Sequence, residues 1–314
     1  MYGRMRSLVF GVAILAVGAA CTHDAPPAAR AHVRLPAFER ADLVALRGGG
    51  ASFYSLAGDH VEALDTLPID HGADAKLDGD WADRDHLFVG IGAARVVAIT
   101  AAGMRPIAVP DLAAVPARAP ERDAIDLRGA QLAVRPGEAW LMTCLRGEPE
   151  GGACTTTGGI RLWPAPAETC IGCPAPVAWA WRNGPPPGVT TRVADDNVTC
   201  TPVAGPPVTI TTASASEHMM GAYWVSASPP RLLVVYGVAG YSDVLQSRWS
   251  LHDGCTAPPV AGGDWVAAGP DGLWIATQPT SSEPHGVTVW RGATRLGELP
   301  DALVRFRPAP PATR

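Results

Sequence analysis

The chain has 314 residues, of which only 18% are charged, and its formal net charge is −5. Because it has no block of Lys and Arg, this composition excludes the clustered basic surface that nucleic-acid binding requires. The 34 glycines and 31 prolines exclude long helices, since proline removes a backbone donor and glycine costs about 1 kcal/mol in a helix interior. With 47% hydrophobic residues available for a core, the sequence predicts an all-β fold.

The N-terminus has the pattern of a secretory signal. Two arginines precede an apolar run, Leu8 to Ala20, which is shorter than the roughly 20 residues of a membrane-spanning helix. Cys21 directly follows three small residues. This arrangement resembles the lipobox of bacterial lipoproteins, although Gly18 stands where that family usually has Leu or another branched residue. The resemblance implies that Cys21 is lipid-modified and anchors the protein outside the cytoplasm, in the cell envelope, on the periplasmic or outer-membrane side.

A strand–turn–strand unit recurs along the rest of the chain. Three copies have proline at the second position of the turn, where its fixed φ suits a type I or II β-turn. They run from Leu132 to Thr143, from Trp224 to Tyr236 and from Trp265 to Thr277. The strand after each turn is rich in aromatic and aliphatic residues, which is typical of a strand buried on both faces. A looser copy, from Asp80 to Ile91, lies upstream.

The spacing of these units predicts a β-propeller. Pro229 and Pro270 are about 40 residues apart, and Pro136 lies about twice that distance before Pro229. Units of 40–50 residues with about four short strands each are the mark of propeller blades. Strand centres near residues 43, 88, 141, 179, 233 and 274 give six blades, and seven is the alternative count. The alternative fold is a β-sandwich of tandem hairpins.

One segment, Gly269 to Trp290, resembles a blade of bacterial sensor-type propellers. It has the Asp-Gly turn, the Leu-Trp-Ile strand and the Gly-Val strand of such blades, whereas the other units share only the outline. The resemblance implies a fold and names no ligand.

These features divide the chain into four parts. Residues 1–20 are a lipoprotein signal peptide, and residues 21–40 are expected to be a flexible tether. Residues 41–308 form the propeller domain, with a Pro- and Cys-rich insertion near 164–208 around a degenerate fourth blade. Residues 309–314 are expected to be a disordered tail.

Six cysteines follow Cys21, and an even number fits disulfides formed in an oxidising compartment. They are Cys144, Cys154, Cys170, Cys173, Cys200 and Cys255. Cys144 and Cys154 flank one proposed hairpin loop, so we expect these two to pair. Cys170 and Cys173 also match a redox pair or half of a zinc site. The prolines that follow disfavour the helix that a redox pair needs, and oxidation competes with zinc binding, so we expect structural disulfides and no cofactor.

Carboxylates gather between Asp70 and His86, where Asp78, Asp80 and Asp83 are candidates for calcium binding. The stretch lacks the EF-hand spacing and its terminal Glu, so a solvated loop between blades is the favoured interpretation and no metal is expected.

Catalytic motifs are few. The chain has no G-x-S-x-G nucleophile elbow. Glu217, Asp243 and Asp264 lie near proposed strands and are the first candidates for the paired carboxylates of a glycoside hydrolase. We expect no acid pair to converge at the centre of the propeller.

The sequence therefore predicts a cell-envelope lipoprotein that acts as a non-catalytic binding or scaffolding module through its propeller face. Its expected partners are the membrane, through the N-terminal lipid, and a protein or glycan ligand. We expect a monomer. Two alternatives stay open: an extracytoplasmic hydrolase that acts on carbohydrate, and an envelope assembly factor.

Overall fold

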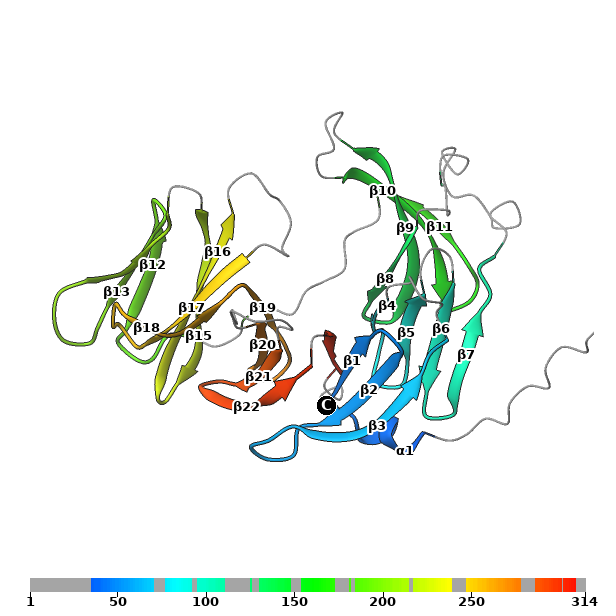
Figure 1. Ribbon diagram of the computed structural model, residues 1–314. Coiled ribbons are helices and arrows are strands. Elements are labelled where there is room, and N and C mark those ends of the chain that lie inside the picture. Colours follow the sequence, from blue (N-terminus) through cyan, green and yellow to red (C-terminus); the bar gives the residue numbers. More distant parts are fainter. Residues whose placement is uncertain are drawn as a thin grey trace, which may run out of the picture. The chain divides into compact units, whose positions relative to one another are not determined.

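The computed structural model describes most of the body of the chain. The described residues are 35–70, 77–91, 95–110, 125, 130–147, 154–172, 181, 184–214, 217–238, 247–277, 286–300 and 302–308. They form six antiparallel β-sheets and a short helix, α1 (Pro36–Arg40), as Figure 1 shows.

Each sheet is given with its strands in spatial order. The first sheet contains β23 (Leu303–Phe306), β1 (Leu43–Arg47), β2 (Gly50–Ser55) and β3 (Glu62–Pro68). The second contains β4 (Leu77–Trp81), β5 (Leu87–Ile91), β6 (Val96–Thr100) and β7 (Gly103–Ile107). The third contains β8 (Gln131–Arg135), β9 (Glu138–Gly147), β10 (Cys154–Trp163) and β11 (Thr169–Ile171).

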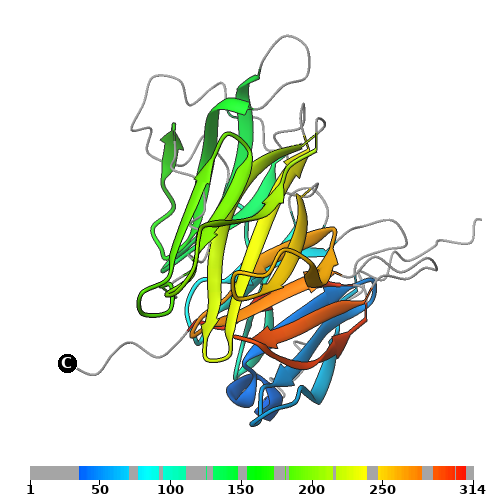
Figure 2. The same cartoon turned by 90° about the vertical axis from the view of Figure 1, so that its left-hand side faces the viewer.

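The remaining three sheets follow in chain order. The fourth contains β12 (Thr190–Ala194), β13 (Asn197–Thr201) and β14 (Val208–Thr212). The fifth contains β15 (Glu217–Ala227), β16 (Pro230–Val238), β17 (Ser247–Asp253) and β18 (Pro259–Gly263). The sixth contains β19 (Trp265–Ala268), β20 (Leu273–Thr277), β21 (Val287–Arg291) and β22 (Thr294–Leu299). Figure 2 faces the fourth and fifth sheets.

This topology is that of a β-propeller with six blades. Five sheets are meanders of strands that follow one another in sequence, and the first is completed by the C-terminal strand β23, which pairs with β1. Such a succession confirms the predicted fold class and rules out the sandwich of tandem hairpins. In the fourth blade, the described residues form three strands.

Central strands are buried on both faces, as their composition predicts. In β16, Leu232 and Val234 pack toward the fourth sheet, whereas the alternating Leu233 and Val235 pack toward the sixth. The period of two along a strand places successive side chains on opposite faces, so one apolar strand serves two cores. Apolar clusters of this kind join the sheets in five pairs: first with second, second with third, fourth with fifth, fifth with sixth, and sixth with first. Within the described ranges, no such cluster joins the third sheet to the fourth.

Five of the six predicted strand centres lie in strands. Residues 43, 88, 141, 233 and 274 fall in β1, β5, β9, β16 and β20. The sixth, residue 179, lies outside the described residues. Much of the expected insertion near 164–208 is itself sheet, since it contains β11, β12 and β13. The high content of proline and threonine suggested a loop in this segment, although part of it forms strands.

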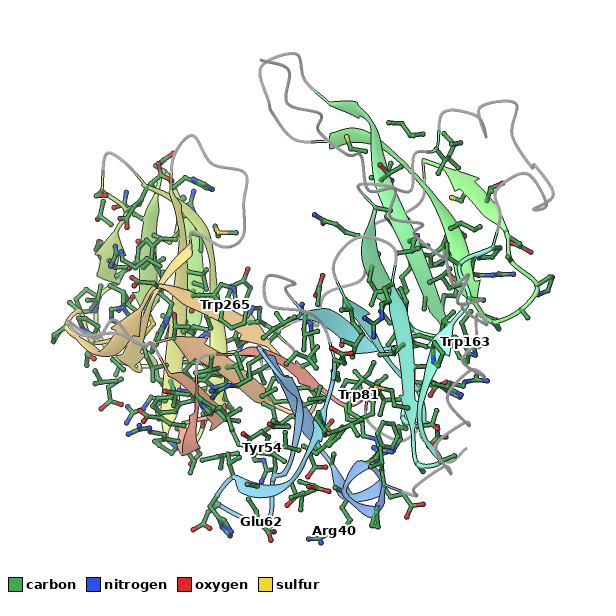
Figure 3. All side chains as sticks on the ribbon, turned by 45° about the vertical axis from the view of Figure 1, so that its right-hand side comes forward. Arg40, Tyr54, Glu62, Trp81, Trp163 and Trp265 are labelled. Carbon is green, nitrogen blue, oxygen red and sulfur yellow. A yellow bond between two sulfur atoms is a disulfide. The ribbon has the colours of Figure 1, made fainter. Side chains whose placement is uncertain are left out.

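The folded body begins earlier than predicted. The expected tether extended to residue 40, but Leu35, Ala37 and Phe38 belong to the core between the first and second sheets, and Phe38 is 0% exposed. Arg40 of α1 lies 3.8 Å from Glu62 of β3, and Figure 3 labels both side chains. The packed region thus includes α1. The signal peptide, Cys21, the rest of the tether and the tail at 309–314 lie outside the described residues.

Candidate binding face

Turns of neighbouring sheets meet at one end of the sheets. We call the turn that joins the first and second strands of a sheet its first turn. In the first turn of the third sheet, the backbone N of Gly137 donates to Ala82 O of the second sheet (2.7 Å). Arg307, directly after β23, donates from Nε to Arg84 O in the first turn of the second sheet (2.7 Å). The Pro136 turn predicted from the sequence is therefore joined to the neighbouring sheet by a hydrogen bond.

The third turns lie at the same end, because the first and third connections of an antiparallel meander leave the same edge. Arg291, at the third turn of the sixth sheet, donates from Nη1 to Gly58 O in the third turn of the first sheet (2.8 Å). We call this end of the sheets, with its first and third turns, the first-turn face.

A cleft of about 400 Å³ opens on the first-turn face between the fifth and sixth sheets. It is lined by Ser226 at the end of β15 and Ser228 after it, and by Asp271 in the turn between β19 and β20. Arg291 at the end of β21 and Thr294 at the start of β22 also line it. Its volume falls in the range of small-molecule sites, about 300–1,000 Å³. The sequence indicated the Pro-containing turns and the Asp-Gly turn as turns, but it did not indicate that they share a cleft, because they meet only through the packing of two sheets.

Arg307 holds the C-terminal strand on the same face. Arg307 is only 6% exposed. Its Nη1 donates to the carbonyl oxygens of Phe38, Glu39 and Ala41 at 3.0, 2.8 and 3.1 Å. The guanidinium also lies 5.3 Å from the ring centroids of Phe38 and Trp81. Burial lowers the pKa of Arg307 from its ordinary value. This arginine is structural, since its donors are used to join α1, the second sheet and the chain end.

Asp78 and Asp80, two of the calcium candidates, lie on β4 at the edge where β4 contacts both β23 and β8. Arg305 of β23 reaches them: its Nη2 lies 3.8 Å from Asp78 Oδ1 and its Nε lies 3.3 Å from Asp80 Oδ2. The same Nε donates to Gly79 O (3.1 Å). The two carboxylates therefore face a cation that the chain itself supplies. The expectation that no acid pair converges at the centre of the propeller stays a prediction.

Asp80 has the more perturbed carboxyl of this pair. Burial raises its pKa from the ordinary value of 3.8 to about 6, and the charge of Asp78 adds to the rise, while Arg305 and the backbone N of Trp81 oppose it. The side chain keeps 41% of its surface, so water still reaches the carboxyl and screens part of this penalty. A carboxyl with a raised pKa at a meeting point of strands is a functional candidate.

Asp83, the third calcium candidate, faces a histidine instead. Its two carboxylate oxygens lie 2.9 and 3.0 Å from His86 Nδ1. The imidazole lies 4.7 Å from the ring of Trp163 in the third sheet, which Figure 3 labels. The structure thus separates Asp83 from Asp78 and Asp80, and the described residues contain no group of three or more His, Cys, Asp or Glu side chains placed to hold a metal ion.

A chain of hydroxyl groups ends on a buried histidine between the fourth and fifth sheets. Tyr236 Oη lies 2.7 Å from Thr211 Oγ1 and 3.1 Å from Ser250 Oγ, which in turn lies 2.9 Å from His252 Nε2. His252 Nδ1 lies 3.1 Å from the carbonyl oxygen of Thr256. Burial lowers the pKa of His252. Since His252 is 1% exposed, this Ser–His pair is closed to substrate and serves the core.

Two of the predicted hydrolase carboxylates, Glu217 and Asp264, lie near the same guanidinium, because the charges of both raise the pKa of Arg248. Glu217 accepts two hydrogen bonds from Arg248, from Nε at 2.6 Å and from Nη2 at 2.9 Å, and these bonds lower its pKa to about 2. Asp264 lies on the exposed approach to β19, and Asp243 lies outside the described residues. Because its lowered pKa keeps Glu217 ionised, this carboxylate is a poor general acid.

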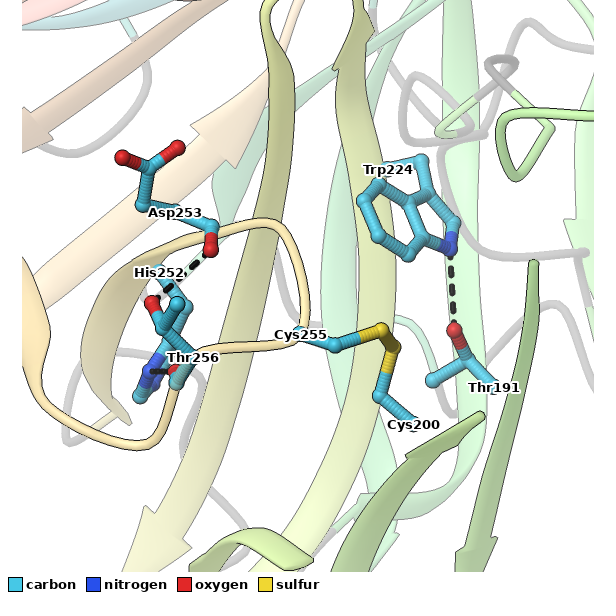
Figure 4. The surroundings of a disulfide bond; sticks show 7 residues. All are labelled: Thr191, Cys200, Trp224, His252, Asp253, Cys255 and Thr256. Carbon is cyan, nitrogen blue, oxygen red and sulfur yellow. Dashed lines mark hydrogen bonds between the residues drawn. A yellow bond between two sulfur atoms is a disulfide. The ribbon is translucent and has the colours of Figure 1, made fainter. Parts of the chain in front are cut away.

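Disulfides are present, as predicted from the cysteine count. Cys200 of β13 is bonded to Cys255 in the loop after β17, with a Cα–Cα distance of 5.4 Å, and so joins the fourth and fifth sheets (Figure 4). Cys144 and Cys170 are each disulfide-bonded as well. The side chain of Cys154 and all of Cys173 lie outside the described part, so the pairing of Cys144 with Cys154 stays a prediction.

Comparison with known proteins gives no family. No protein-family model matches the chain, and no curated protein matches it. Among solved structures, the chain is similar to an oligogalacturonate lyase in complex with manganese, with 10% identity over 77% of this chain and 68% of that chain and a TM-score of 0.27. It is also similar to BamB from Moraxella catarrhalis, with 14% identity over 86% of this chain and 78% of that chain and a TM-score of 0.23. At these scores neither likeness carries an argument about function. In the residues that the structure describes, no helix has the length and apolar character to cross a membrane.

Proposed function

We propose that the protein is a cell-envelope lipoprotein whose propeller binds a ligand or partner through the first-turn face without catalysing a reaction. The observation that carries this proposal is the cleft between the fifth and sixth sheets, which is lined by polar residues at the first turns of both sheets, Ser226, Ser228 and Asp271 among them. The turns are fixed by the packed sheets below them, and rigid loops on a scaffold are the usual place for binding residues.

The acid–base groups of the described residues support a binding role. Asp80 faces Arg305, Glu217 is bonded to Arg248, and His252 is buried. A catalytic site needs such groups free to exchange protons with a substrate. These three are engaged inside the protein instead.

Membrane attachment through Cys21 rests on the sequence pattern of the signal and the small residues before the cysteine. A Cys21→Ala variant expressed in the native host should leave the membrane fraction, because lipid attachment needs that thiol. The Cys200–Cys255 disulfide fits an oxidising compartment. Unchanged membrane retention of Cys21→Ala would contradict the anchor.

The binding face itself is tested by photo-cross-linking in intact cells. A photoreactive residue replaces Thr294 on the first-turn face or, as a control, Gly48 in the turn between β1 and β2 at the opposite edge, where a side chain meets nothing within 4 Å. We expect adducts from Thr294 and none from Gly48. An adduct with an outer-membrane assembly protein would assign the module to envelope assembly. Equal labelling from both positions would contradict a specific face.

A second candidate function is carbohydrate hydrolysis, and the pKa of Asp80, about 6, is the observation that favours it. A carboxyl whose pKa is raised toward neutral pH can serve as a general acid in glycosidases, with a second carboxylate opposite. Asp78 is the only described carboxylate in contact with the same guanidinium. Hydrolysis of chromogenic glycosides that disappears in Asp80→Asn would establish this function, whereas no turnover by the wild type would leave the binding role.

A further inference from the structure

The tripeptide Asn197-Val198-Thr199 has the form of an N-glycosylation acceptor, Asn-x-Ser/Thr with any residue but proline in the middle. The only other asparagine of the chain, Asn183, is followed by Gly-Pro and has no hydroxyl residue at the third position. Acceptor asparagines of this kind belong to exported chains, and the N-terminal signal predicts export. A three-residue match arises readily by chance, so its weight depends on the surroundings of Asn197.

Asn197 begins β13 directly after a two-residue turn. Asp195 and Asp196 form this turn between β12 and β13 with φ of 50° and 57°, and both are exposed. Positive φ at both central residues is typical of the type I′ turn of a tight hairpin. The acceptor residue therefore lies next to an exposed hairpin tip, the kind of place where a chain tolerates added bulk.

The side chain of Asn197 lies on the face of the fourth sheet that is turned away from the fifth. Val198 and Cys200 belong to the apolar cluster between these two sheets. Because successive side chains of a strand point to opposite faces, Asn197 and Thr199 lie on the other face. None of the five apolar clusters of described residues covers that face. A glycan on Asn197 would therefore not enter a core.

The hydrogen bonds of the Asn197 amide leave one N–H position open. Nδ2 donates to Asp195 O (2.7 Å), and Oδ1 accepts from Thr212 Oγ1 (2.6 Å). A side-chain amide has two N–H donors, and among the described residues the second has no acceptor. An N-linked glycan replaces one amide hydrogen and leaves the carbonyl oxygen as an acceptor. Both hydrogen bonds are therefore compatible with a glycan on Nδ2.

The turn before Asn197 lies far from the first-turn face. Asp196 Oδ1 accepts from Met219 N near the start of β15 (3.1 Å), whereas Ser226, which lines the cleft, is near the end of that strand. The stretch of strand from Met219 to Ser226, at the usual rise per residue, separates these two points by roughly 20 Å. A glycan on Asn197 thus leaves the first-turn face open for a ligand or partner.

We propose that Asn197 carries an N-linked glycan in the mature protein. The donor is an oligosaccharide linked to a polyprenyl diphosphate in the membrane that the chain crosses during export. Asn197 Nδ2 attacks C1 of the first sugar, so the N–C1 bond forms and the bond from C1 to the diphosphate oxygen breaks. The polyprenyl diphosphate leaves with the electron pair, and the amide nitrogen loses one proton. This inference goes beyond the proposed binding function and depends only on export.

Mass spectrometry of the full mature protein from its native host tests the proposal. We expect an added mass of whole sugar residues, which fragmentation of the peptide places on Asn197. Asn197→Gln and Thr199→Val should each lose this mass completely, because the first removes the nucleophile and the second the hydroxyl of the acceptor sequence. Thr199→Ser keeps a hydroxyl and should keep the glycan. The control Asn183→Gln should be modified as the wild type is.

An unmodified Asn197 in the wild type would overturn the proposal, and so would a glycan that Thr199→Val retains. Because valine is favoured in strands, Thr199→Val should fold even if Asn197→Gln disturbs the turn. Failure here is distinct from failure of the proposed function. The same spectrum reports the lipid on Cys21 separately, and cross-linking from Thr294 in cells does not require a glycan on Asn197.

Discussion

The junction between the first and second sheets and the junction between the fourth and fifth are held by different chemistry. At the first, Arg305 and Arg307 on or just after the short strand β23 bond to carboxylates and carbonyls. At the second, the Cys200–Cys255 disulfide crosses from a sheet with three described strands. The first junction includes the four-residue strand β23, and the second includes a sheet with three described strands. The first is held by charged side chains and the second by a covalent bond. Stability at the first should respond to the charges of its side chains, and at the second to the disulfide.

The largest effect should come from the disulfide. A Cys200→Ala/Cys255→Ala variant should lose about 4 kcal/mol of unfolding free energy on the chain-entropy model, because the bond closes a separation of 55 residues in the unfolded chain. Urea unfolding at neutral pH without reductant measures the loss. The control is the wild type with reductant, which removes this bond together with the others and should be at least as unstable. A midpoint equal to that of the oxidised wild type would show that packing alone holds the fourth sheet.

At the arginine junction, Arg307→Met should cost about 3 kcal/mol. The apolar side chain fills similar space but leaves the carbonyls of Phe38, Glu39 and Ala41 without their donor, and each buried unpaired acceptor costs about 1–3 kcal/mol. Arg47→Met on β1 is the matched control, since that arginine is exposed, and it should change the unfolding free energy little. An equal loss of unfolding free energy in Arg307→Met and Arg47→Met would mean that the hydrogen bonds of Arg307 do not stabilise the fold.

The sequence could predict the features that depend on residues close together in the chain. The alternation of apolar residues in Leu232 to Tyr236 is a local property, and it correctly predicted a strand with two buried faces. The Pro-containing turns were equally local, and their place at strand ends is confirmed for residues 136, 229 and 270. Local patterns thus determined the class and most blade positions.

Contacts between sheets were beyond such patterns. Arg307 is 223 residues from Arg84, whose carbonyl it bonds, and nothing near either residue in sequence signals the other. The pair Cys200–Cys255 is likewise one of the fifteen pairings that six cysteines allow. The cleft between Ser226, Asp271 and Arg291 arises only when two sheets pack, so no motif could indicate it. The apolar α1 segment was misjudged because the prolines around it are typical of a tether.

His252 should make the stability of the second junction depend on pH. Burial lowers its pKa in the folded state, so below its ordinary value of 6.5 the unfolded chain binds more protons than the folded one. The unfolding free energy should therefore be highest above that pH and fall as the pH is lowered, by at most about 1.4 kcal/mol per pH unit for one proton. The part of the slope due to this group should vanish in His252→Gln and persist in the exposed control His60→Gln. An unchanged slope in His252→Gln would assign the pH dependence to other groups.

Asp80 should show the smallest effect, with the opposite sign. Because burial raises its pKa to about 6, the folded protein binds more protons than the unfolded chain between about pH 4 and 6, and stability from this group falls as the pH rises through that window. At pH 7, Asp80→Asn should therefore be slightly more stable than the wild type, by less than about 1 kcal/mol, since the partly exposed carboxyl is screened by water. The exposed control Asp70→Asn should show no such gain. A gain at Asp80 would mean that the chain keeps a charge there at a cost in stability, which is expected of a residue retained for function. A loss would show that attraction to Arg305 outweighs burial, and would make Asp80 part of the same structural junction as Arg307.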